Sequence, residues 1–162
     1  MKKPLLVLST LLFILSSSPL VMAGDSKGPL GLGLELGDPS GFTVKYWTGY
    51  RTAFDGYIGG SYFGSPRIGI DYLWHFPGRQ SNIVHFYAGL GGTIGFGSGH
   101  GIFWGHGWSN EGVGLGARGL AGLTYEPHTV PLEFFLELGL LVGVTPNFGS
   151  ALEAGIGLRF YP

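Results

Sequence analysis

The sequence contains no cysteine and few charged residues, and each shortage narrows what the protein can be. Without cysteine there is no disulfide, no catalytic thiol and no residue to which the acyl chains of a lipoprotein are attached. Charged residues make up 12% of the chain, against about 25% in ordinary globular proteins. So few charges would solvate the surface of a soluble domain poorly. The formal charge of -1 is also too weak to indicate a nucleic-acid partner.

Sequence suited to a membrane-spanning helix is also lacking. Glycine supplies 32 of the 162 residues, and each glycine costs a helix interior about 1 kcal/mol relative to alanine. The long uncharged stretch Phe86–Asn110 contains glycine throughout, so we do not expect it to form such a helix. The glycines do not follow the strict third-residue period of collagen either.

The first residues have the three parts of a secretory signal peptide. Lys2 and Lys3 precede an apolar run, Leu5–Leu15, and small residues ending at Ala23 resemble a cleavage site. The run is shorter than the roughly 20 residues that a membrane-spanning helix needs. We therefore expect residues 1–23 to be removed on export, which takes away two lysines and makes the formal charge -3.

Residues 24–162 are expected to form one domain, and within it apolar and polar residues alternate with a period of two. This alternation is typical of β-strands whose two faces differ. Turn residues, such as those of Asp38–Gly41, separate the alternating segments. An even number of strands suits a closed barrel with both ends on one side. The eight predicted strands are Leu30–Leu36, Phe42–Trp47, Phe54–Ser61, Arg67–Phe76, Ile83–Ile94, Val113–Tyr125, Leu132–Leu140 and Ala151–Tyr161.

One parity of these segments carries large apolar residues, such as Leu132, Phe134 and Leu136, and the other parity carries every strand charge. A lipid-facing Arg or Lys at the bilayer centre costs about 2–4 kcal/mol, so we expect the charged parity to face the barrel interior. Glycines concentrate on the same parity and leave room in a lumen that is only wide enough for side chains. The predicted lumen network is Glu35, Lys45, Asp55, Arg67, Asp71, Arg118, Glu133, Glu137, Glu153 and Arg159.

Two predicted hairpins indicate how these charges pair. A register that sets Glu133 opposite Arg159 makes one pair, and a first hairpin with Leu36 opposite Phe42 places Lys45 diagonal to Glu35. Because buried charges must be paired and the lumen is narrow, we predict a salt-bridged filling rather than an ion pathway.

Aromatic residues gather where alternate strands end, as they do in the girdles of membrane barrels. With the N-terminus in the periplasm, the longest connection, Gly95–Gly112, becomes extracellular. Its aromatic residues Phe103, Trp104 and Trp108 are candidates for contact with lipopolysaccharide or a surface partner. The predicted periplasmic girdle is Tyr46, Trp47, Trp74, Phe76, Tyr125 and Phe160.

The first predicted hairpin, Leu34–Trp47 (LELGDPSGFTVKYW), resembles that of the small OmpA-like outer-membrane β-barrels, in particular the branch whose members have no characterised role. The likeness extends over essentially the whole mature chain. It implies a barrel embedded in the outer membrane and inserted by the barrel-assembly machinery, which in such proteins reads the last strand. In this chain Pro162 follows Tyr161, where the family commonly ends on an aromatic residue.

One enzymatic alternative rests on residues 106–110, His-Gly-Trp-Ser-Asn. They resemble the His-x-Ser-Asn element of outer-membrane lipid A deacylases, in which the histidine is the base for a serine nucleophile. Here His106 and Ser109 are one residue further apart, so on a strand they would face opposite sides. Glu111 or Glu126 would have to complete the site, and neither has positional support. The favoured interpretation is a glycine-rich surface loop.

Two further alternatives are a metal site and a soluble barrel. His75 and His85 are predicted to face each other across a turn, and His100 and His106 lie in the long connection, but histidines alone do not make a site of three or four converging ligands. A soluble periplasmic barrel of the lipocalin kind would turn the apolar parity inward around an apolar ligand. It would leave its outer surface glycine-rich and poorly charged.

We therefore expect an all-β protein, an eight-stranded antiparallel transmembrane β-barrel of up-and-down topology in the outer membrane. It is predicted to be a monomer without cofactor, bound metal or enzymatic activity. Its expected partners are outer-membrane lipid, lipopolysaccharide, the barrel-assembly machinery and an unidentified molecule outside the cell, with no nucleic acid among them.

Overall fold

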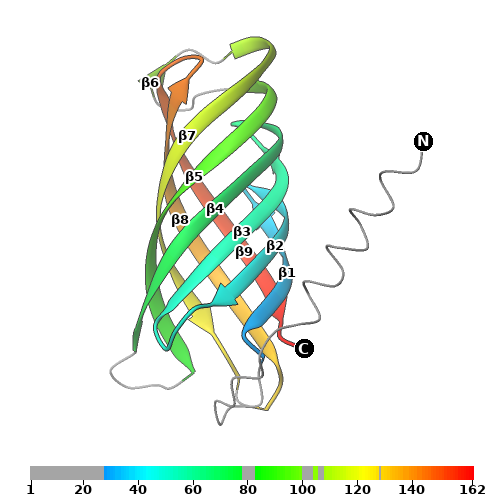
Figure 1. The fold of residues 1–162 in the computed structure, drawn as a ribbon, viewed down its shortest axis with the longest axis vertical. Helices are drawn as coiled ribbons and strands as arrows, with labels where there is room; N and C mark the ends of the chain where they lie inside the picture. Colours follow the sequence, from blue (N-terminus) through cyan, green and yellow to red (C-terminus); the bar gives the residue numbers. More distant parts are fainter. Residues whose placement is uncertain (1–27, 78–82, 100–103, 106–107, 128) are drawn as a thin grey trace, which may run out of the picture.

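The structure, a computed structural model, describes residues 28–77, 83–99, 104–105, 108–127 and 129–162. They form one antiparallel sheet in which the eight long strands pair in chain order and the first strand pairs with the last, closing a barrel (Figure 1). The predicted all-β, up-and-down barrel is confirmed. The long strands are β1 (Leu30–Gly37), β2 (Ser40–Trp47), β3 (Thr52–Ser61), β4 (Gly64–Pro77), β5 (Val84–Gly99), β7 (Trp108–Tyr125), β8 (Leu132–Thr145) and β9 (Gly149–Phe160).

The remaining strand, β6 (Trp104–Gly105), has two residues and pairs with the start of β9 beyond the closed barrel. Sequence alternation gave no sign of so short a strand. Among the described residues, no helix is long and apolar enough to cross a membrane. The predicted signal peptide, residues 1–23, lies outside the described part of the chain.

The predicted long connection Gly95–Gly112 is largely wrong, because the β5–β7 hairpin continues into it. Cα pairing runs to Gly97 opposite Gly112 and, after a bulge, to Gly99 opposite Trp108. The interpretation as a loop rested on glycine content, but backbone hydrogen bonds between two strands do not require side chains. The β5–β7 hairpin therefore extends beyond β4, because the pairing of β4 with β5 ends at Arg67 opposite Gly95.

The predicted register of the first hairpin is also wrong by two residues. Leu34, not Leu36, lies opposite Phe42, and Glu35 lies opposite Gly41. The cause is a turn that begins early: Gly37 has a φ of 130°, a conformation that glycine adopts readily. Its N–H donates a hydrogen bond of 3.0 Å to the Ser40 hydroxyl, so the turn centres on residue 38 instead of residue 39.

The two faces of the sheet differ sharply. Large apolar side chains cover the outside of the barrel, where Leu36 and Leu138, for example, are 69% and 64% exposed. Charged side chains point inward, and every charged strand residue whose side chain is described is buried. A soluble barrel with an apolar interior would have the reverse arrangement, so the structure does not have the orientation that the lipocalin alternative required.

Candidate functional site

The interior of the barrel is the candidate site, because all ten charged residues predicted for the lumen lie there. Their exposed fractions range from 0% to 4%. Hydrogen bonds and ion pairs sort nine of them into two groups. The Arg118 cluster consists of Arg67, Asp71, Arg118, Glu137 and Glu153. The Arg159 cluster consists of Lys45, Asp55, Glu133 and Arg159.

Arg118 on β7 is the centre of the first cluster and contacts three carboxylates. Its Nε donates to Glu153 over 2.8 Å and its Nη2 donates to Glu137 over 2.9 Å. Its Nη1 forms an ion pair with Asp71. The Tyr87 hydroxyl donates a further hydrogen bond of 2.8 Å to Glu137. One guanidinium thus joins side chains from β4, β8 and β9 across the lumen.

Arg67 on β4 extends this cluster toward the end of the barrel that carries the β5–β7 hairpin. It shares Glu153 with Arg118 through a second ion pair. Its remaining donors are satisfied by neutral groups: Thr93 at 2.8 Å, Ser61 at 2.9 Å and the Tyr57 hydroxyl at 2.9 Å. Because every nitrogen of the planar guanidinium has a partner, its position is tightly defined.

Arg159 on β9 is the centre of the second cluster. Its Nη1 donates to Glu133 over 2.6 Å, and the two residues are Cα partners in the register that the sequence predicts. Its Nη2 pairs with Asp55 on β3 and also donates to the Thr43 hydroxyl over 3.0 Å. The guanidinium carbon lies 3.8 Å from the centre of the Phe135 ring, within the range of a cation–π interaction.

Glu133 links Arg159 to a second cation, Lys45 on β2, whose Nζ lies 2.9 Å from Glu133 Oε2. The same oxygen accepts a hydrogen bond of 2.7 Å from the Tyr161 hydroxyl. Tyr161 in turn accepts one of 3.3 Å from the Trp47 indole N–H. This chain of contacts runs toward the end of the barrel where β1 begins and β9 ends.

Glu35 is the one predicted lumen charge that belongs to neither cluster. The sequence placed it diagonal to Lys45, but the two-residue shift of the first hairpin sets Lys45 opposite Gly31. Lys45 binds Glu133 instead. Among the described residues, Glu35 makes no ion pair, and its Oε1 is buried without a hydrogen-bond partner. The predicted pairing of Glu35 with Lys45 is therefore wrong.

Neutral polar residues complete the network, and sequence reasoning missed them. Thr43, Tyr57, Tyr87 and Tyr161 each hydrogen-bond a lumen charge. Three of them, Thr43, Tyr57 and Tyr161, lie two residues from a lumen charge and so have its parity. Their parity could have identified these three residues as facing the lumen, but the sequence prediction considered only charged residues.

Several aromatic rings in the lumen lie over a glycine of the neighbouring strand. A Cβ atom built on Gly157 would strike the Phe135 ring, and one built on Gly122 would strike the Tyr87 ring. Tyr57 lies over Gly69 and Tyr161 over Gly31 in the same way. These glycines thus have a specific role: because they lack a side chain, they leave space for the aromatic rings that fill the barrel.

Two glycines of β7 allow this role to be tested. We expect Gly122→Ala to lower the free energy of unfolding by about 1–3 kcal/mol, the usual cost of overpacking, because the new methyl would meet the Tyr87 ring and a backbone oxygen. Gly119→Ala is the matched control, since its methyl would lie 3.5 Å from the nearest atom, in Leu90. Urea unfolding in lipid vesicles measures both, and equal effects at the two positions would contradict the assignment.

Large side chains pack inside the lumen near both of its ends. Near the β5–β7 hairpin, Phe63 from the β3–β4 turn is buried against Leu141. At the opposite end, His75 lies between Trp47 and Tyr87, at ring-centre distances of 4.4 and 5.2 Å. The structure therefore corrects two predictions. Trp47 packs against the buried core instead of joining the outer girdle, and His75 is the Cα partner of Tyr87 and not of a histidine.

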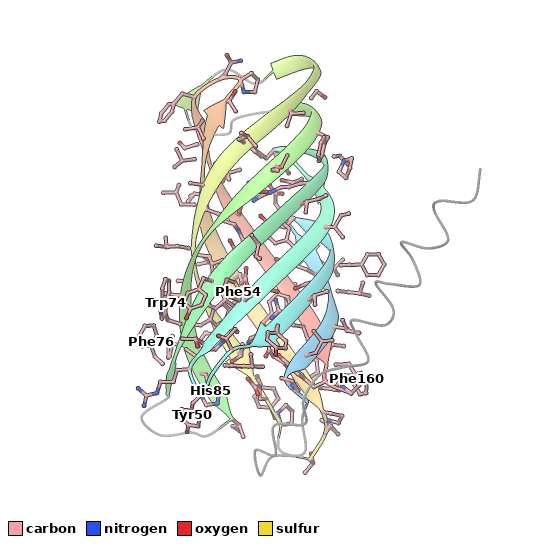
Figure 2. The ribbon with its side chains drawn as sticks, in the orientation of Figure 1. Tyr50, Phe54, Trp74, Phe76, His85 and Phe160 are labelled. Carbon is pink, nitrogen blue, oxygen red and sulfur yellow. The ribbon has the colours of Figure 1, made fainter. Side chains whose placement is uncertain are left out.

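The other five predicted girdle residues lie on the outer surface, with exposed fractions from 40% to 54%. Figure 2 shows Trp74, Phe76 and Phe160 near the end of the barrel where the β2–β3 turn carries Tyr50. The five are Tyr46, Trp74, Phe76, Tyr125 and Phe160. They form a girdle of aromatic side chains around the end of the barrel where β1 begins and β9 ends.

Of the three aromatic residues predicted to make contacts in the outer loop, the structure describes two. Trp104 begins β6 and Trp108 begins β7, whereas Phe103 lies outside the described residues. His106 of the enzymatic alternative also lies outside the described residues, while Ser109 lies on β7. Among the described residues, no three histidine or carboxylate side chains form a group suited to a metal ion.

Comparison of the chain with models of protein families, with curated protein sequences and with solved structures gives no match. The functional conclusion therefore depends on the geometry of the barrel.

Proposed function

We propose that the protein is an integral outer-membrane β-barrel with a filled lumen, which acts as a structural or surface-interacting component and not as a pore or an enzyme. The observation that carries this proposal is the separation of the two faces. The outer face exposes rows of large apolar side chains, and the described strand charges are buried inside. In water such an outer surface would promote aggregation, whereas in a bilayer it contacts the hydrocarbon chains of the lipids.

Strand length and aromatic placement support the same proposal. A tilted strand needs about 9–11 residues to cross the hydrocarbon core, and six of the eight long strands have between 10 and 18. The ring of Tyr46, Trp74, Phe76, Tyr125 and Phe160 is suited to one membrane interface. The resemblance to OmpA-like barrels favours placing that end in the periplasm.

This orientation directs the β5–β7 hairpin out of the cell. The hairpin extends beyond the pairing of β4 with β5 and of β7 with β8, so its outer part stands clear of the barrel wall. A projecting hairpin of this kind is well placed for contact with lipopolysaccharide or with a molecule at the cell surface. The proposed role needs no cofactor and involves no catalytic step.

A pair of arginine substitutions tests the membrane assignment. Leu136→Arg places a charge on the outer face of β8, where Leu136 is 48% exposed, and we expect it to cost about 2–4 kcal/mol in a bilayer. Tyr50→Arg is the control, because Tyr50 is 92% exposed in the β2–β3 turn and should tolerate the charge. Both variants are compared by membrane fractionation and by urea unfolding in lipid vesicles.

The soluble alternative gives the opposite result. If the outer face met water, Leu136→Arg would increase solubility and leave stability nearly unchanged, and the wild-type chain would fractionate with soluble periplasmic proteins. Either finding would overturn the proposed function.

A further inference from the structure

Glu35 is the feature of the lumen that the ion-pair network does not explain. The residue is 4% exposed, and its Oε1 is buried without a hydrogen-bond partner. That oxygen lies over Gly155, at a position where a Cβ atom on Gly155 would collide with it. Gly155 is the Cα partner of Glu137, and the charge of Glu137 acts on Glu35.

The charge balance of the lumen leaves no cation for Glu35. Seven carboxylic residues of the described chain are buried, against four basic residues. All four basic side chains already contact other carboxylates, either in the Arg118 cluster or in the Arg159 cluster. Among the described residues, no ion pair joins the two clusters.

The charged groups that act on Glu35 come from four strands. Glu137 on β8 and Asp55 on β3 repel an ionised carboxylate, while Arg118 on β7 and Arg159 on β9 attract it. Both arginines are the centres of their clusters and use their donors on other groups. An ionised Glu35 would thus be a buried charge without a bonded partner, an arrangement that proteins avoid by neutralising the group.

We propose that Glu35 is a proton-binding site, at which the folded barrel holds one proton from the solvent at neutral pH. The neutral carboxyl group gains an O–H donor, which the adjacent Glu137 carboxylate is able to accept. The proton would therefore join Glu35 to the Arg118 cluster through Glu137. A proton suits the site better than a divalent metal ion, because no three metal-binding side chains of the described chain come together. The inference depends on the filled lumen and not on the membrane in which the barrel sits.

Infrared spectroscopy of the folded protein in detergent micelles detects the proton directly. A protonated carboxylic acid has a carbonyl stretch well separated from the carboxylate bands, and we expect wild-type protein at neutral pH to show it. Glu35→Gln should remove the Glu35 contribution to this band. Glu133→Gln is the matched control, because Glu133 is equally buried but binds Lys45 and Arg159 and should not contribute.

Two spectroscopic results would overturn the proposal. One is a wild-type spectrum without the protonated-acid band, and the other is a band that Glu35→Gln leaves unchanged. The measurement is repeated with sodium chloride replaced by choline chloride. A band that appears only without sodium would assign the site to an alkali cation instead of a proton.

The pH dependence of stability provides an independent readout. When the folded state keeps a proton that the unfolded chain has released, raising the pH lowers the free energy of unfolding. The wild-type urea midpoint should therefore fall relative to that of Glu35→Gln between about pH 5 and about pH 9. Titrating groups far from Glu35 behave alike in both proteins and cancel in the comparison, whereas Glu137 and Asp55, whose charges act on Glu35, contribute to the difference. A difference that stays constant with pH would refute the bound proton.

Discussion

Replacement of Arg118 by methionine should be the most damaging single substitution in the lumen. Arg118 is the only basic partner of Asp71 and of Glu137 among the described residues, whereas Glu153 retains Arg67. Breaking one buried pair typically costs about 3–5 kcal/mol, so Arg118→Met is expected to lower the free energy of unfolding by at least that amount. Urea unfolding in lipid vesicles, followed by tryptophan fluorescence, measures the loss.

Additional substitutions separate loss of charge pairing from loss of packing. Arg118→Met combined with Asp71→Asn and Glu137→Gln leaves no stranded carboxylate in the cluster and should recover a large part of the lost stability. Arg51→Met, at an exposed position in the β2–β3 turn, controls for removal of an arginine and should have little effect. If the triple variant were no more stable than Arg118→Met, the cost would lie in packing and the ion-pair account would be wrong.

The second large effect is expected at Arg159, where the structure predicts which partner substitution restores stability. Arg159→Met should cost about 3–5 kcal/mol, because it leaves Asp55 without a cation while Glu133 keeps Lys45. Adding Asp55→Asn should recover much of this loss. Adding Glu133→Gln should not, because Lys45 then loses its partner as well. The three variants are compared by reversible urea unfolding in lipid vesicles.

This comparison distinguishes the network seen here from the simpler pair that the sequence suggests. If Glu133 and Arg159 formed an isolated pair, Glu133→Gln would be the better rescue of Arg159→Met. That outcome would show that Lys45 and Asp55 do not have the contacts described for the Arg159 cluster.

Much of the barrel could be predicted because alternation along a strand decides which face each side chain occupies. The inward position of the lumen charges follows from parity alone. The contact between Glu133 and Arg159 also follows, since the two residues are direct partners on adjacent strands. Contacts across the lumen could not be found in this way. The pairing of Lys45 with Glu133, from β2 to β8, depends on how the closed barrel staggers its strands.

The errors have local physical causes. The early turn at Gly37 depends on a backbone conformation that a residue count does not reveal, and it separated Glu35 from Lys45. Trp47 is the last residue of β2 and has the same parity as Lys45, whose Nζ lies 4.4 Å from the centre of its ring. Parity therefore indicated an inward ring, and the general tendency of aromatic residues to lie at strand ends was given too much weight.

The ion pairs also constrain the order in which the barrel can assemble. Arg159 reaches Asp55 over a separation of 104 residues, Lys45 reaches Glu133 over 88, and Arg67 reaches Glu153 over 86. Each pair joins an early strand to one of the last two, so in a partly assembled sheet that lacks β8 and β9 these partners of Lys45, Asp55 and Arg67 are missing, whereas Arg118 on β7 keeps Asp71 on β4. We therefore expect a sheet without β8 and β9 to be much less stable than the closed barrel, because these three charges gain their partners only when the last two strands are added.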